Sequence, residues 1–207
     1  MKNVRLLTLV MTLGMACNVF AEGDAAAGKS LYATCPACHG ANGEGNKALN
    51  APKLAGQEEW YLVRQLQSFK EGIRGSDAKD MFGMQMRPMA MTLADDKAIA
   101  DVAAYIATFE VKAAAATIEG DAAKGKAAYG VCTACHGPKA EGNAGLNAPR
   151  LAGMDDWYQV TQLKNFKAGI RGKHPKDTFG AQMQPMALTL ADDQTILDVV
   201  AYINTLQ

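Results

Sequence analysis

Apolar residues recur at helical spacing through most of the chain, which predicts an all-α fold. One helix is expected from about Glu58 to Glu71, where Trp60, Val63 and Leu66 follow the spacing of a single helix face. Gly72 comes next and is the type of residue that ends a helix. We interpret this apolar stripe as core packing.

A later helix is expected to open at residues 92–95, whose sequence Thr-Leu-Ala-Asp resembles a capping box. Beyond it, Ile99, Val102 and Ile106 recur at helical spacing and should face the core. Tyr105 lies on the same predicted helix. The pattern therefore places a strongly apolar helix at the end of this part of the chain.

A helix near residue 25 is predicted by Asp24, which is a good N-cap residue. Gly28 and Tyr32 are four residues apart and share a face of this helix. A glycine inside a helix costs about 1 kcal/mol relative to alanine, so its presence needs a reason. Close crossing with the later apolar helix supplies one, and it places Tyr105 near the crossing.

The whole pattern occurs twice. Residues 23–110 align with residues 120–207 without a gap, at a constant offset of 97 residues. Such a duplication predicts two copies of one fold, as domains at residues 22–110 and 120–207. Residues 111–119 are rich in alanine and form the linker, either as a helical extension or as a loose strap.

Residues 1–21 are predicted to be a cleaved secretory signal peptide. Lys2 and Arg5 supply its positive start, Leu6–Met15 is an apolar stretch too short to span a bilayer, and a small-residue cleavage site closes the segment. The mature chain is therefore expected in the periplasm, without a transmembrane helix. Cys17 lies inside the segment, and the sequence leaves its lipidation, and with it peripheral membrane association, open.

Composition narrows the picture only slightly. The chain of 207 residues is 49% hydrophobic and 20% charged, as in ordinary globular proteins. It has 21 basic and 21 acidic residues, and loss of residues 1–21 leaves 19 basic against the same 21 acidic residues. The mature chain is therefore weakly acidic, and its sequence shows no cluster of basic residues. Nucleic-acid binding is not expected.

The motif Cys-x-x-Cys-His occurs once in each copy, and its members are Cys35, Cys38 and His39, then Cys132, Cys135 and His136. This spacing is typical of covalent haem attachment. Two thiols add to the two vinyl groups on one edge of the porphyrin, and the adjacent imidazole becomes an axial ligand of the iron. The sequence thus predicts two covalently bound haem c groups.

Other uses of the motif fit less well. A thioredoxin-like pair would begin a helix in a βαβ pattern, which this chain lacks. A structural zinc site needs four ligands, and each motif offers three. A disulfide between residues three apart would close only a trivial loop.

The second axial ligand can be sought by elimination. His174 is the one histidine outside the motifs, and its counterpart is Asp77, so it cannot serve both copies. Among the eleven methionines, repetition at the offset of 97 singles out two pairs, Met86 with Met183 and Met89 with Met186. Each pair would give a thioether ligand, which favours ferrous iron.

These features resemble class I cytochrome c, and two such domains after a signal peptide resemble the dihaem cytochrome c4 family. The resemblance implies that Met86 and Met183 are the axial ligands. It also implies that the carbonyl groups of Pro52 and Pro149, each 13 residues after its histidine, accept a hydrogen bond from the histidine ring. The two domains should pack about a pseudo-two-fold axis with their haem edges facing.

A haem held by histidine and methionine has no open position for a substrate, so the expected function is single-electron transfer and not catalysis. The resemblance implies a quinol-oxidising complex as donor and a terminal oxidase as acceptor. Two alternatives are a dihaem subunit of a larger dehydrogenase of the flavocytochrome type and a dihaem enzyme resembling a peroxidase. The second would need one displaceable ligand, and the equivalence of the two methionine segments argues against it.

Overall fold

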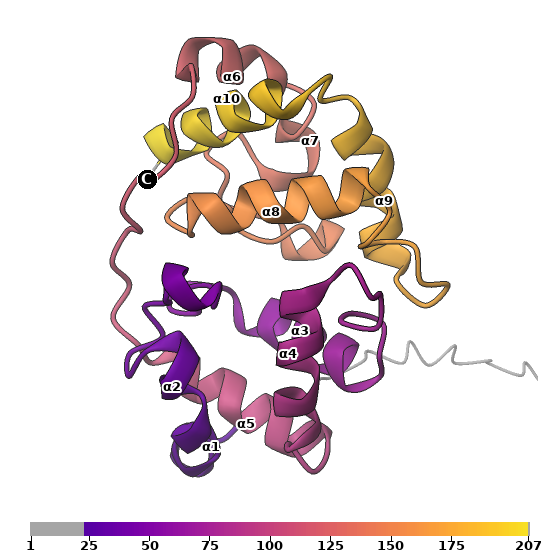
Figure 1. Ribbon diagram of the computed structural model, residues 1–207. Helices are drawn as coiled ribbons and strands as arrows, with labels where there is room; N and C mark the ends of the chain where they lie inside the picture. The colour runs from indigo at the N-terminus through magenta and orange to yellow at the C-terminus, as the bar shows by residue number, and fades with distance from the viewer. Residues whose placement is uncertain (1–22, 207) are drawn as a thin grey trace, which may run out of the picture.

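The computed structural model describes residues 23–206, and these residues form two stacked helical units (Figure 1). We call residues 23–110 the first half and residues 120–206 the second half. The linker, residues 111–119, runs along one side of the molecule from one unit to the other (Figure 1). The predicted signal peptide, with Cys17, lies outside the described residues.

The two halves contain the same helices in the same order. In the first half they are α1 (Ala25–Leu31), α2 (Pro36–His39), α3 (Glu59–Lys70), α4 (Met81–Met91) and α5 (Asp96–Ala107). In the second half they are α6 (Ala122–Tyr129), α7 (Thr133–His136), α8 (Asp156–Lys167), α9 (Thr178–Leu188) and α10 (Asp193–Ile203). Residues 23–206 form no strand beyond two isolated bridges, so the all-α prediction is confirmed.

The predicted close crossing of the first and last helices is present in both halves. A Cβ atom added to Gly28 of α1 would lie 1.9 Å from the carbonyl oxygen of Asp101 in α5. A Cβ atom at Gly125 of α6 would lie 1.8 Å from that of Asp198 in α10. The aromatic rings near the crossing also meet, with the centroids of Tyr32 and Tyr105 5.6 Å apart. Glycine is therefore required at both crossings.

The apolar helices otherwise follow the pattern, with one correction. Ile99, Val102 and Ile106 are at most 3% exposed. However, α5 begins later than the capping-box pattern predicts, because the carboxylate of Asp95 caps it by accepting from the Ala98 amide at 2.8 Å. Thr92 instead ends α4, where its hydroxyl donates to the Met89 carbonyl at 2.7 Å.

The helix predicted from Glu58 to Glu71 is α3, and these two residues occupy the positions just before and just after it. Gly72 follows with φ of 74°, as expected for a residue that ends a helix. Leu62, Val63 and Phe69 are buried, whereas Trp60 and Leu66 are only half-buried. The buried face packs on α5, and the opposite side of α3 turns towards the second half.

The linker has no helical residues, so of its two predicted forms it adopts the strap. It is not loose, however. Asp156, at the start of α8, accepts hydrogen bonds from the backbone amides of Thr117 at 2.5 Å and Ile118 at 3.0 Å. At the other end of the linker, the Lys53 ammonium group of the first half donates to the Lys112 carbonyl. The strap is therefore fastened to both halves.

Candidate functional site

Each Cys-x-x-Cys-His motif forms a single helical turn. Cys35 precedes α2, and His39 is the last residue of α2. The backbone amide of His39 donates to the Cys35 carbonyl at 2.9 Å. The bond between the His136 and Cys132 backbone groups is also 2.9 Å. Because one turn contains all three side chains, the two sulfur atoms and the imidazole lie on one short segment. All four cysteines of the motifs are free thiols.

The two imidazoles are buried and held in one orientation. The Nδ1 atom of His39 lies 2.7 Å from the carbonyl oxygen of Pro52, and that of His136 lies 2.8 Å from the oxygen of Pro149. A carbonyl oxygen can only accept, so Nδ1 must carry the proton and Nε2 keeps its lone pair. Burial also lowers the pKa of both rings, and the bond to the proline carbonyl only partly opposes it. Each ring is therefore neutral, and its Nε2 atom is available to bind a metal.

A tight turn places each proline carbonyl. In the first half, the amide of Asn46 donates to the Ala51 carbonyl at 2.7 Å, and the reverse bond is 3.1 Å long. Asn50 closes the turn with φ of 53°, a left-handed conformation that asparagine tolerates. Pro52 follows directly, so this turn fixes its carbonyl opposite His39. The same turn recurs at Asn143 and Ala148.

The thiols do not have the character of redox nucleophiles. Burial raises the pKa of Cys35, and it raises that of Cys132 to about 11. A reactive thiolate would need the opposite shift. A zinc site also lacks ligands, because among residues 23–206 no three histidine, cysteine, aspartate or glutamate side chains come together in a way that could hold a metal ion.

The methionines found by repetition lie on α4 and α9. Met86 and Met183 are half-buried, whereas Met89 and Met186 are each 40% exposed. The two members of each helix's pair, Met86 with Met89 and Met183 with Met186, are three positions apart, and so they share a side of their helix. His174 lies in the loop before α9, half-buried, where its ring accepts from the Lys176 amide at 3.2 Å.

Two buried arginines lie between the halves. Arg74 and Arg171 are 6% and 7% exposed, and each stacks on a phenylalanine of its own half. Arg74 donates to Gln65 at 2.6 Å and, across the interface, to Gln162 at 3.3 Å. Arg171 donates to Gln162 at 2.9 Å and across the interface to Gln65 at 3.2 Å. The contacts are reciprocal, as a pseudo-two-fold arrangement requires.

These arginines test whether the residues fit a haem. Neither guanidinium forms an ion pair with a carboxylate of residues 23–206, and the Nε atom of each is buried without a hydrogen-bond partner there. Buried guanidinium groups are costly unless negative charge lies near them. The Asp80 carboxylate acts on Arg74 from beyond ion-pair distance, and among residues 23–206 no carboxylate contacts either guanidinium. A haem carries two propionate carboxylates, which would supply negative charge there. The free thiols, the neutral imidazoles and the buried guanidinium groups all fit the group.

Sequence reasoning did not single out Arg74 and Arg171. The signal was available, because both stand at the same position of the repeat in an equivalent Gly-Ile-Arg-Gly segment. A charged residue that recurs within an apolar context is a candidate for a buried role, but its burial depends on the packing of the other half.

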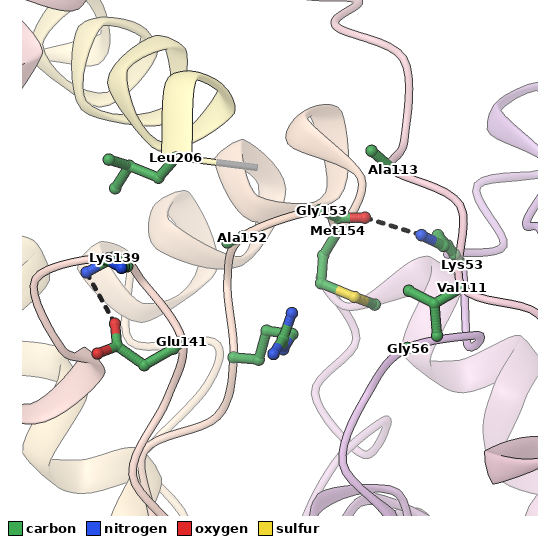
Figure 2. Close-up of a pocket in the computed structure, with 11 residues that line it drawn as sticks. Lys53, Gly56, Val111, Ala113, Lys139, Glu141, Ala152, Gly153, Met154 and Leu206 are labelled. Carbon is green, nitrogen blue, oxygen red and sulfur yellow. Dashed lines mark hydrogen bonds between the residues drawn. The ribbon is translucent and has the colours of Figure 1, made fainter.

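A cavity of about 300 Å³ lies where the linker meets both halves (Figure 2). Lys53 crosses this junction and donates from Nζ to the Gly153 carbonyl at 2.8 Å (Figure 2). The side chains of Val111, Met154 and Leu206 supply apolar walls. No residue of the cysteine motifs lines this cavity. The ammonium group of Lys53 already donates to the backbone carbonyls of Lys112 and Gly153.

Comparison with known proteins agrees with this geometry. The family model described as cytochrome c matches twice, at residues 25–110 and 122–207. A protein named cytochrome c4 from Pseudomonas aeruginosa is 37% identical, with 99% of each chain covered. A protein from Thiomonas intermedia named thiosulfate dehydrogenase electron acceptor is 36% identical, over 93% of this chain and 87% of its own.

Solved structures give the same result. The crystal structure of reduced recombinant cytochrome c4 from Pseudomonas stutzeri matches with a TM-score of 0.68 and 31% identity. The match covers 89% of this chain and all of that chain, so it includes both halves. Within residues 23–206, none of the helices has the length and apolar character that a membrane crossing requires.

Proposed function

Because the chain belongs to the cytochrome c family, in the tandem form of cytochrome c4, we propose that each half holds its haem through its own cysteine motif. The protein carries two covalently bound c-type haems and is an electron carrier, not an enzyme. In this proposal Cys35 and Cys38 form the thioether bonds of the first haem. Cys132 and Cys135 form those of the second.

The axial ligands follow from the same argument. His39 and His136 would hold the iron through Nε2, and Met86 and Met183 would supply the second protein ligand of each haem. The observation that carries this proposal is the pair of bonds from Nδ1 to the proline carbonyls, at 2.7 and 2.8 Å, because they leave Nε2 as the only ligand atom. The greater burial of Met86 than of Met89 favours the first as ligand.

When bound, the haem supplies one-electron exchange between ferric and ferrous iron. The residues of the chain orient the ligands and set the charge around the haem. Pro52 and Pro149 orient the imidazoles and increase their basicity, which stabilises ferric iron, while the thioethers favour ferrous iron. Arg74 and Arg171 provide buried positive charge that offsets the propionates. With a histidine and a methionine both bound, the residues of the chain would exclude substrates from the iron.

We also propose that the protein works in the periplasm, between a quinol-oxidising complex and a terminal oxidase. The signal peptide predicted at residues 1–21 and the proposed ligation by histidine and methionine support this role, since such a carrier needs only an exposed route for single electrons. A second candidate is acceptance of electrons from a dehydrogenase. The name of the Thiomonas intermedia relative, thiosulfate dehydrogenase electron acceptor, favours that alternative.

The test is an optical redox titration of the mature protein with haem counted per chain. We expect two haems and the weak sulfur-to-iron band at the red end of the ferric spectrum. Replacing Met86 or Met183 by alanine should each remove about half of that band, while the same change at Met89 or Met186 should leave it. A colourless protein, or a band that survives the loss of Met86 and Met183, would overturn the assignment. Reduction by a purified quinol-oxidising complex or by a dehydrogenase then separates the two partner classes.

A further inference from the structure

Two acidic residues at the starts of helices do not cap their own helices. Glu58 precedes α3 and Asp155 precedes α8, the position where a carboxylate normally accepts from the first amides of its helix. Neither side chain makes such a bond. Each instead reaches into the opposite half, and the two contacts are equivalent under the repeat.

The amides that these carboxylates bind are specific ones. Asp155 accepts from the backbone amide of Lys53 through Oδ2 at 2.7 Å, and Glu58 accepts from that of Arg150 through Oε2 at 2.9 Å. The Lys53 amide belongs to the same peptide group as the Pro52 carbonyl. That carbonyl is the acceptor for His39.

One peptide group therefore links an imidazole to a carboxylate of the other half. In the first half the series runs from His39 through the Pro52 carbonyl and the Lys53 amide to Asp155, with bonds of 2.7 and 2.7 Å. The second half repeats it from His136 to Glu58, with bonds of 2.8 and 2.9 Å. The peptide bonds of the described residues are all trans, so the carbonyl and the amide of each linking group point in opposite directions.

The chain makes room for each carboxylate. A Cβ atom at Gly45 would lie 3.0 Å from Oδ2 of Asp155, and one at Gly142 would lie 2.6 Å from Oε1 of Glu58. The contacts are also partly shielded from water, because Asp155 and Glu58 are half-buried. Burial raises the pKa of both carboxyl groups, although the amides of Lys53 and Arg150 act against it. Hydrogen bonds in such surroundings polarise one another more strongly than in water.

We propose that Asp155 and Glu58 are positioning residues that set the reduction potential of the haem in the opposite half. A carboxylate that accepts from the amide increases the negative charge on the carbonyl of the same peptide group. The carbonyl then accepts more strongly from Nδ1, the imidazole becomes a better electron donor to iron, and the ferric state is stabilised. This inference rests on the proposed ligation by His39 and His136. It makes the potential of each half depend on contact with the other.

The test uses neutral and charged replacements in both halves. Asp155→Asn should raise the potential of the first haem, and Glu58→Gln that of the second, because each loses its charge while keeping an acceptor. We expect the ratio of ferrous to ferric haem at a fixed potential to rise about tenfold, which is about 59 mV for one electron. Asp155→Glu and Glu58→Asp should keep most of the effect, since each half already carries the other's residue at this position.

The potentials are assigned to the two haems by the proton resonances of the axial methionines during a redox titration. Crossed shifts support the proposal. Equal shifts of both haems would reduce the effect to unspecific charge, and shifts in the half that contains the replaced residue, or none, would also overturn it. If a variant fails to fold, the wild-type protein still decides. The Lys53 and Arg150 amide protons should resonate far downfield and exchange slowly, and ordinary amide shifts would contradict the proposal.

Failure of the proposed function gives a different result. In that case the haem count or the sulfur-to-iron band of the unmodified protein is absent. Failure of this inference alone leaves both in place and removes only the crossed shifts.

Discussion

The two halves agree at their cysteine motifs, and they differ at some of the contacts that they make with each other and with the linker. The hydroxyl of Tyr32 donates to the Gly40 carbonyl at 2.8 Å, and Tyr129 donates to Gly137 at the same distance. The imidazole bonds differ by only 0.1 Å, at 2.7 and 2.8 Å. In contrast, Arg64 of α3 has Thr161 as its counterpart in α8, and the two side chains make unrelated contacts.

The same contrast is seen along α4 and α9. Met81, Met84 and Met91 of α4 are 60%, 42% and 57% exposed, and their counterparts are Thr178, Ala181 and Leu188. The surface beside the methionine that we propose as ligand therefore differs between the halves, whereas the hydrogen bonds around the cysteine motifs are the same. The halves share the contacts around the cysteine motifs, which covalent haem attachment requires. The surface residues that differ between α4 and α9 can give the two haems different surroundings.

The helix crossing should be equally sensitive in both halves. A side chain at Gly28 or Gly125 would collide with a backbone carbonyl at 1.9 or 1.8 Å, which no rotamer change relieves. We expect Gly28→Val and Gly125→Val each to lower the free energy of unfolding by about 3 kcal/mol or more. Denaturant unfolding, followed through the haem absorption, measures this loss.

A nearby glycine is the matched control. Gly130 follows α6 with helical backbone angles, and a Cβ atom there would meet only the Ala127 oxygen at 3.2 Å. Its counterpart in the first half is Ala33. Gly130→Ala should therefore be neutral or stabilising by up to about 1 kcal/mol. A clear difference between the Gly28 and Gly125 variants would show that the two crossings are not equivalent.

The sequence predicted whatever depends on local pattern or on the repeat. Local pattern and repetition predicted the crossing glycines and the apolar face of α5. Family resemblance predicted the proline carbonyl groups that accept the hydrogen bonds of the histidine rings. It misplaced the start of α5, because Thr92 and Asp95 are both good caps and only the chain path from α4 decides between them. It did not find Glu58 and Asp155, since a carboxylate at a helix start is usually a cap and only the docked second half reveals another partner. The choice of Met86 over Met89 stays a prediction.

Asp156 should make the linker contact depend on pH in the second half only. Asp156 is 1% exposed, whereas its counterpart Glu59 is half-buried. Burial alone would raise the pKa of Asp156, but hydrogen bonds from Thr117, Ile118 and Asn204 outweigh it and lower that pKa. A lowered pKa stabilises the folded state above the pKa of the unfolded carboxyl, about 3.9, and this stabilisation is lost as the pH falls below it.

Asp156→Asn is therefore expected to cost about 2 kcal/mol at neutral pH, the usual range for hydrogen bonds to a charged group. The difference from wild type should shrink below about pH 3, where the wild-type carboxyl is also protonated. Unfolding free energies at the two pH values measure it, and Glu59→Gln serves as the control with little effect. A cost that is the same at both pH values would contradict the assigned role of the charge.

Arg64 is the clearest difference across the interface. Its guanidinium donates to the side chain and the backbone carbonyl of Asn147, both at 3.0 Å, and lies 4.8 Å from the centre of the Phe179 ring. Thr161 instead donates to the Trp157 carbonyl of its own helix at 2.9 Å. The contact of Arg64 with the second half thus has no counterpart made by Thr161 with the first half.

Replacing each residue by the other tests whether this contact is a matter of one side chain. Arg64→Thr should weaken the interface by about 1 to 2 kcal/mol, because two hydrogen bonds and a cation-aromatic contact are lost. Thr161→Arg should recover a similar amount, because Asn50 and Phe82 are the counterparts of Asn147 and Phe179, and a strict pseudo-two-fold relation would place them within reach of residue 161. Unfolding of the two single variants and of the double exchange measures both effects. If Thr161→Arg gains nothing in either background, the pseudo-two-fold relation fails at this edge, and the halves are tilted enough to separate what the repeat makes equivalent.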